Sequence, residues 1–214
     1  MKLYTYFRSS AAYRVRIALH LKGLAFDAVP VHLLQGDGQQ HAAAYAALNP
    51  NETVPTLDDD GLVLTQSLAI IEYLDETHPA PPLLPGSAAD RARIRAIAQT
   101  IACDIHPINN LRVLQHLTQA FSLSEAQKNA WYCHWVERGL QTVEKMLARD
   151  PRTGRFCHGD APTLADCCLV PQVFNARRFG CSVAGLSTVL RIGAECEKLD
   201  AFARAAPGNQ PDAE

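Results

Sequence analysis

The chain has 214 residues and a formal net charge of −2 at pH 7, and 48% of its residues are hydrophobic. This balance supports a buried core and argues against a nucleic-acid partner, and no apolar run is long enough to span a bilayer. The seven cysteines are odd in number and form no C-x-x-C pair. That usage favours a reduced, cytoplasmic protein with neither a disulfide framework nor a metal site.

The first residues have an α/β pattern. Residues 2–6 are rich in Tyr and Thr and predict a strand. Ser9 and Ser10 follow, and serine is a preferred residue at a helix start because its hydroxyl accepts a backbone N–H. A helix from there to about Lys22 and a second strand over residues 26–31 would form a right-handed βαβ unit. A serine hydroxyl at the positive end of the helix is suited to hold an anion.

A second part of the same domain follows. Residues 41–48 predict a short helix, and Asp60-Gly61 predicts a turn between two strands. A further helix is expected to begin at Ser67. The pattern therefore predicts a βαβ-ββα domain over residues 1–78. Four prolines mark a linker over residues 79–87.

Beyond the linker the apolar spacing is helical, which predicts an all-helical domain over residues 88–214. Pro107 is expected to bend or locally break the first helix. Thr163 and Asp166 have the spacing of a capping motif at a helix start. The expected helices cover residues 88–118, 125–148, 163–179 and 187–202.

The motifs are more specific than the architecture. Those that carry a resemblance are Tyr6–Leu19, Ala47–Pro50, Val54–Leu57, Gln66–Leu74, Leu169–Val173 and Gln210–Asp212. With them the chain resembles the zeta class of glutathione transferases, the maleylacetoacetate isomerases. Residues 103–110 are similar to bacterial members that include maleylpyruvate isomerases. The resemblance covers nearly the whole chain and implies a thioredoxin-like N-terminal domain, an all-α C-terminal domain and a homodimer.

The resemblance also implies that the bound anion is the thiolate of glutathione. Ser9 matches the serine that hydrogen-bonds this thiolate, and Val54 matches a residue whose backbone pairs with the cysteinyl part. Pro55 matches a proline whose peptide bond is cis. Gln66 and Ser67 match the pair that holds the γ-glutamyl end. The other matched glutathione contacts are Ser10, Ala11, Gln40, His106 and Asn110.

The family reaction isomerises a conjugated dicarboxylic keto-acid from cis to trans. Arginine suits such a substrate because its guanidinium pairs with carboxylates. Arg8 and Arg178 match arginines of the family site, and Arg112 matches a position of the maleylpyruvate-type members. The expected function is isomerisation of maleylacetoacetate in homogentisate catabolism of tyrosine and phenylalanine. Alternatives are isomerisation of maleylpyruvate in gentisate catabolism, a glutathione-consuming transferase or dehalogenase, and a non-enzymic binding module.

Two departures from the family pattern stand out. Ala11 occupies the position of a cysteine in animal members, so the only thiol there would come from glutathione. Residues 182–187 replace a proline-containing loop of the family. Arg14 and Arg16 are expected to be structural and to pair with acids such as Glu72 or Asp104.

Overall fold

The computed structural model describes residues 1–214, which divide into two compact units. Unit 1 contains residues 1–84 and 197–214, and unit 2 contains residues 85–196. The sequence placed residues 197–214 in the helical domain. They pack in unit 1 because the short helix α9 lies against α1 at the opposite end of the chain.

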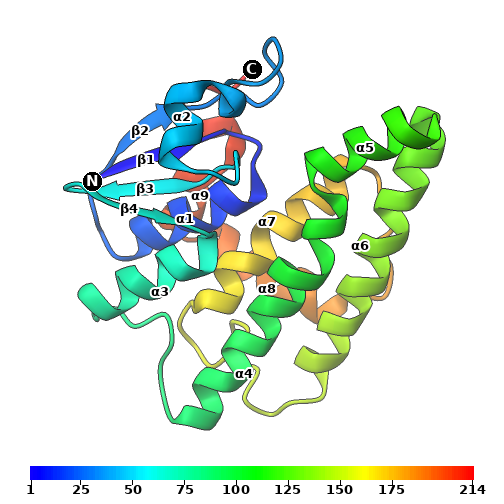
Figure 1. The fold of residues 1–214 in the computed structure, drawn as a ribbon. Coiled ribbons are helices and arrows are strands. Elements are labelled where there is room, and N and C mark those ends of the chain that lie inside the picture. Colours follow the sequence, from blue (N-terminus) through cyan, green and yellow to red (C-terminus); the bar gives the residue numbers. More distant parts are fainter. The chain divides into compact units, whose positions relative to one another are not determined.

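Unit 1 contains one four-stranded sheet with the order β2-β1-β3-β4 (Figure 1). Its strands are β1 Lys2–Thr5, β2 Asp27–Pro30, β3 Thr56–Asp59 and β4 Leu62–Thr65. Strands β1 and β2 are parallel, whereas β3 is antiparallel to both β1 and β4. The expected βαβ-ββα order is therefore present. The helices of unit 1 are α1 Ser10–Leu21, α2 Ala43–Leu48, α3 Ser67–Thr77 and α9 Asp200–Ala205.

The hairpin between β3 and β4 turns where the sequence predicted. Asp60 and Gly61 have φ angles of 50° and 94°, and positive φ at both central residues suits a two-residue hairpin. The carboxylate of Asp58 accepts a hydrogen bond from the Gly61 N–H at 2.8 Å. The core beneath the sheet includes Leu3 and Leu57, which are opposite each other in register and fully buried.

Unit 2 is helical. Its helices are α4 Ala88–Gln99, α5 Leu111–Phe121, α6 Glu125–Ala148, α7 Leu164–Arg178 and α8 Ser187–Glu197. The expected run over residues 88–118 is interrupted by a π-helix over Thr100–Ile105 and a 3-10 turn over Pro107–Asn109. Gly139 allows α6 to lie close to this π-helix, because a Cβ at position 139 would collide with the side chain of Ile105.

Two further expectations need correction. The helix predicted over residues 187–202 is two helices, α8 and α9, because Leu199 has an extended backbone with φ −90° and ψ 131°. The expectation of no disulfide is also wrong, since Cys133 is bonded to Cys181. Their Cα atoms are 4.9 Å apart because α6 packs against α7. A separation of 48 residues gives no local signal of that proximity.

The predicted capping motif before α7 is confirmed. The carboxylate of Asp166 accepts hydrogen bonds from the N–H and the hydroxyl of Thr163, both at 2.8 Å. It also accepts the Cys157 N–H. Burial raises the pKa of this carboxyl, while these hydrogen bonds act in the opposite direction.

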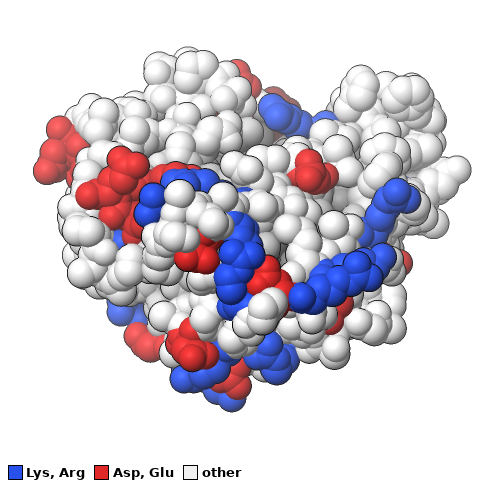
Figure 2. All heavy atoms as spheres, turned by 90° about the horizontal axis from the view of Figure 1, so that it is seen from below, with Lys and Arg blue, Asp and Glu red and all other residues white.

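Charged side chains of both signs lie among one another on the face drawn in Figure 2. No helix combines the length and the apolar character needed to cross a membrane.

Candidate active site

The turn between β1 and α1 places Ser9 at the N-cap of α1. Its φ and ψ are −68° and 118°, and its Oγ accepts the Ala12 N–H at 3.2 Å. A hydroxyl that accepts in this way keeps its proton to donate to another group. Ser10 is buried in the first turn and Ala11 is half-buried beside it. The site therefore offers an O–H donor at the positive end of a helix.

Arg8 lies directly before Ser9 and is held by its neighbours. Its Nη2 donates to the Tyr6 hydroxyl at 2.9 Å and contacts the Glu214 carboxylate at 3.4 Å. The guanidinium also lies over the Phe7 ring, 4.7 Å from its centroid. The buried Nε of Arg8 has no hydrogen-bond partner, so the group retains a donor for an anionic ligand.

The loop before β3 holds a second element of the site. The Val54–Pro55 peptide bond is cis, as the resemblance implied. Val54 precedes the paired register of β1 and β3, which begins at Thr56, and its backbone makes no hydrogen bond within the protein. Tyr45 and Asn49 fix the loop, since the side chain of each donates to the Thr53 carbonyl, at 2.6 and 2.7 Å. An extended ligand segment could therefore pair with Val54 as an added strand.

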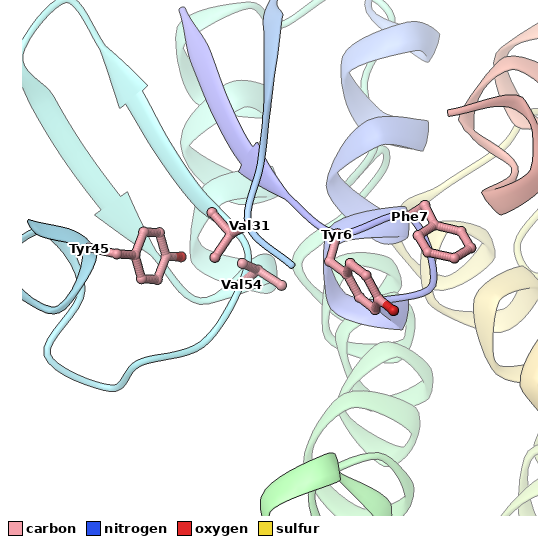
Figure 3. Packing of buried hydrophobic residues seen from close by; sticks show 5 residues of the cluster. All are labelled: Tyr6, Phe7, Val31, Tyr45 and Val54. Carbon is pink, nitrogen blue, oxygen red and sulfur yellow. The ribbon is translucent and has the colours of Figure 1, made fainter. Parts of the chain in front are cut away.

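A small apolar cluster lies where these segments meet. It consists of Tyr6, Phe7, Val31, Tyr45 and Val54, all of them buried. In Figure 3 the two valines lie between the rings of Tyr45 and Tyr6. The cluster anchors the turn after β1 and the loop before β3 to the same part of unit 1.

Gln66 and Ser67 form the start of α3. Gln66 has φ 70° and ψ 115°, a conformation that an L-residue rarely adopts and that is found more often at functional sites than elsewhere. Ser67 is buried, and its Oγ accepts a hydrogen bond from Arg14 Nη1 at 3.2 Å. Together they place a hydroxyl, a buried guanidinium and a helix N-terminus at one point, a suitable site for a carboxylate.

Gln40 lies in a 3-10 turn over Gln39–His41 and is buried. Its Nε2 contacts the His41 ring at 2.9 Å, while its Oε1 has no partner. His41 in turn contacts the Glu52 carboxylate. This buried amide oxygen is therefore able to accept a hydrogen bond from a ligand donor.

The other predicted residues lie in unit 2. His106 follows the π-helix, and Asn110 caps α5 by accepting the Arg112 N–H at 3.2 Å. Arg112 is exposed on the first turn of α5. Arg178 ends α7 as an exposed residue, with its guanidinium 4.8 Å from the centroid of the Phe179 ring.

Three residues around the first turn make contacts that the sequence did not predict. Arg16 is fully buried and donates to the carbonyls of Phe7 and Ala205 rather than pairing with the acids expected. Asp212 accepts the Phe7 N–H, and Glu214 contacts Arg8. The match at Gln210–Asp212 was the only sequence signal for this segment.

Comparison with known proteins identifies the family. The family model for the glutathione S-transferase N-terminal domain matches residues 3–82, and that for the C-terminal domain matches residues 125–181. A Vibrio cholerae protein named "Probable maleylacetoacetate isomerase" is 52% identical over 211 residues, which cover 99% of this chain and 97% of that protein. The chain belongs to the glutathione transferase family.

Two solved structures are similar to the whole chain, and the first of them places it in the zeta class of glutathione transferases. One is a holo structure of maleylpyruvate isomerase, a bacterial zeta-class glutathione transferase, with a TM-score of 0.97 and 48% identity. The other is maleylacetoacetate isomerase from Methylobacterium extorquens AM1 with bound malonate and GSH, with a TM-score of 0.96 and 45% identity. Both cover 100% of each chain. The predicted family and fold class are confirmed.

Proposed function

We propose that this zeta-class glutathione transferase is a glutathione-dependent isomerase that converts maleylacetoacetate to fumarylacetoacetate in the homogentisate branch of tyrosine and phenylalanine catabolism. The observation that carries the proposal is the Ser9 hydroxyl, which remains free to donate at the N-terminus of α1. The kinship to isomerases of this name supports the same reaction.

The polar groups of unit 1 fit glutathione. Val54 offers an unpaired peptide to the cysteinyl part, and Gln66 with Ser67 offers a carboxylate site to the γ-glutamyl end. Gln40 offers its unpaired Oε1 to the glycyl end. The remaining proposed contacts of glutathione are Ser10, Ala11 and Pro55 of unit 1 with His106 and Asn110 of unit 2. Ala11 leaves the reactive thiol to glutathione alone.

When bound, glutathione would supply the thiolate that adds to the cis double bond, permits rotation and leaves as the trans alkene forms. Ser9 would donate its hydroxyl proton to the sulfur as a hydrogen bond. The N-terminus of α1 and the Arg8 charge favour the thiolate over the thiol, whose ordinary pKa is about 8.5. The protein thus stabilises the nucleophile without transferring a proton to it.

Arginines would bind the substrate. Arg8, with its unpaired Nε, and Arg178 are the proposed partners of the substrate carboxylates and of the carbonyl oxygen on which negative charge develops. Arg112 is a further candidate because it is exposed at the start of α5. Bound malonate in the Methylobacterium extorquens relative supports a dicarboxylate as ligand.

A second candidate substrate is maleylpyruvate, favoured by the zeta-class relative that bears this name. Comparing kcat/KM on the two keto-acids decides between them.

We further propose a cytoplasmic homodimer. Leu62 and Val63 support self-association, because they are exposed apolar residues on the edge strand β4.

The decisive experiment follows conversion of maleylacetoacetate with and without glutathione. We expect turnover only when glutathione is present, with the thiol concentration unchanged at the end. The proposal would be overturned if neither keto-acid showed glutathione-dependent turnover. Net loss of thiol or an accumulating conjugate would instead assign the chain to glutathione-consuming transferases or dehalogenases.

A further inference from the structure

Residues 207–214 lie against the turn that carries Arg8 and Ser9, although they are about two hundred residues away along the chain. The Phe7 N–H donates to Asp212 Oδ2 at 3.0 Å. Glu214 contacts Arg8 at 3.4 Å and the His32 ring at 2.8 Å. The proposed active-site turn is therefore held partly by a distant segment.

The other side of the same turn is held by Arg16. Its guanidinium donates to the Tyr6 carbonyl at 3.3 Å and to the Phe7 carbonyl at 2.9 Å. The Tyr6–Phe7 peptide is thus fixed at both ends, its C=O by Arg16 and its N–H by Asp212. Burial lowers the pKa of Arg16 to about 10, while the charge of Asp212 acts in the opposite direction. Arg16 therefore stays cationic at neutral pH.

The fixed peptide is coupled directly to Ser9. The Tyr6 carbonyl that receives Arg16 also accepts the Ser9 N–H at 2.9 Å. A shift of this peptide would move the N-cap of α1 and with it the Ser9 hydroxyl. Displacing a reacting group by about 1 Å can lower a rate by roughly a hundredfold.

The segment that presents Asp212 is itself anchored. Gln210 Nε2 donates to the carbonyls of Arg204 and Ala206, at 2.8 and 2.9 Å. Asn209 Nδ2 donates to the Ala203 carbonyl at 2.7 Å. Because α9 packs on α1, Asp212 has a fixed support from which to hold the turn.

We propose that Asp212 is a positioning residue for the isomerase: with Arg16 it fixes the Tyr6–Phe7 peptide, so that Ser9 and Arg8 are aimed at the thiolate and the substrate. This inference rests on the proposed function. It assigns to residues 207–214 a role in turnover beyond that of a surface segment. Asp212 acts through the backbone and touches neither glutathione nor the keto-acid.

The test compares Asp212→Ala with Asp212→Asn, whose amide oxygen can still accept the Phe7 N–H. Asp200→Asn on the exposed start of α9 is the matched carboxylate control. We expect Asp212→Ala to lower kcat about tenfold to a hundredfold. The KM for glutathione should stay within about twofold, because Val54 and Ser67 are unaffected. Asp212→Asn should recover most of kcat, and the control should match the wild type.

A second readout separates position from charge. The thiol pKa of bound glutathione is followed through the ultraviolet absorbance of the thiolate. Misplacement of Ser9 in Asp212→Ala should raise this pKa. Removal of a nearby negative charge alone would lower it in both variants, and that result would overturn the inference.

Failure of the proposed function and failure of the inference about Asp212 give different results. A wild type without glutathione-dependent turnover overturns the proposed function, and the thiol pKa of bound glutathione then still tests Asp212. If the wild type is active and Asp212→Ala has the same kcat, only the inference about Asp212 is overturned. If Asp212→Ala does not fold, Asp212→Glu replaces it, because it keeps the charge but displaces the acceptor. Lower kcat at unchanged glutathione affinity supports the proposal, and wild-type kcat overturns it.

Discussion

The guanidinium of Arg14 on α1 donates a hydrogen bond to the Ser67 hydroxyl at the start of α3, with 3.2 Å between Nη1 and Oγ. Both side chains are buried. Because Oγ accepts from Arg14, the hydroxyl proton remains for a ligand. The pair links α1 to the start of α3 and provides positive charge beside a free donor.

Ser67→Ala removes that donor. We expect the Kd for glutathione to rise about tenfold to a hundredfold, since a hydrogen bond to a charged group contributes roughly 1.5–3 kcal/mol. Calorimetric titration of the protein with glutathione measures the change. Ser124→Ala, which removes the N-cap of α6 in unit 2, is the control and should lower stability without altering Kd. Equal Kd values for Ser67→Ala and the wild type would contradict the assignment.

Ser9→Ala should affect turnover more than binding. Loss of the hydrogen bond to the thiolate should lower kcat about tenfold to a hundredfold, while Val54 and Ser67 keep glutathione bound. Loss of the N-cap should also cost about 1 kcal/mol of stability. Steady-state kinetics and thermal unfolding test the two effects. Ser9→Thr retains a hydroxyl and should retain much of the activity, and an unchanged kcat in Ser9→Ala would exclude the role.

Gln66→Gly separates backbone strain from ligand contact. Glycine adopts positive φ readily, so the stability should change by no more than about 1 kcal/mol. Glutathione affinity should nevertheless fall, because the side-chain amide is lost. Ser122→Gly provides a control at a second positive φ, 54°, at the end of α5. Isothermal titration and thermal unfolding are measured for both, and full affinity in Gln66→Gly would show that its amide does not contact glutathione.

Glu144 of α6 provides the N-terminal cap of α8. Its carboxylate accepts the N–H groups of Thr188 and Val189, at 3.0 and 2.8 Å. Burial acts to raise the pKa of Glu144, but these hydrogen bonds outweigh it and the pKa is lowered from 4.5. The folded state thus favours the carboxylate. The contribution to stability is complete above the unfolded-state pKa and is lost as the pH falls through the folded-state value.

Glu144→Gln should therefore lower the melting temperature at pH 7. Glutamine keeps one acceptor oxygen but replaces the other with an NH2 group, so one of the two cap hydrogen bonds is lost. This loss costs about 0.5–2 kcal/mol, which corresponds to a few degrees for a chain of this size. The difference from the wild type should shrink as the pH falls below 4.5 and through the lowered pKa at which the folded-state carboxylate becomes protonated. Thermal unfolding across pH 3–7 measures this. A difference that is independent of pH would contradict the capping role.

The Cys133–Cys181 disulfide is tested by counting thiols. The unfolded, unreduced chain should titrate five thiols, and the reduced chain seven. Reduction should also lower stability by about 2–4 kcal/mol. Seven thiols in the unreduced protein would refute the bond. A Cys133→Ser variant should show reduced stability in the absence of reductant.

Local signals in the sequence were sufficient to predict most of the helices, strands and turns. The start of α1 at Ser9, the Asp60-Gly61 turn and the cap formed by Thr163 with Asp166 depend on torsions and hydrogen bonds within a few residues. The motifs around them also identified the family. The candidate glutathione residues of unit 1 came from the same motifs, and the structure adds the hydrogen bonds that orient them.

Only the tertiary structure decided which distant segments meet. Arg16 was expected to be structural and to pair with an acid, yet packing buries it and directs it to the carbonyls before Ser9. Asp212 belongs to a matched motif, but the motif does not say which part of the fold the residue contacts. The packing of α9 on α1 brings it to the Phe7 N–H. The cap of α8 by Glu144 and the disulfide are further examples. Such contacts depend on how separate elements pack, and no pattern within either segment specifies their partner.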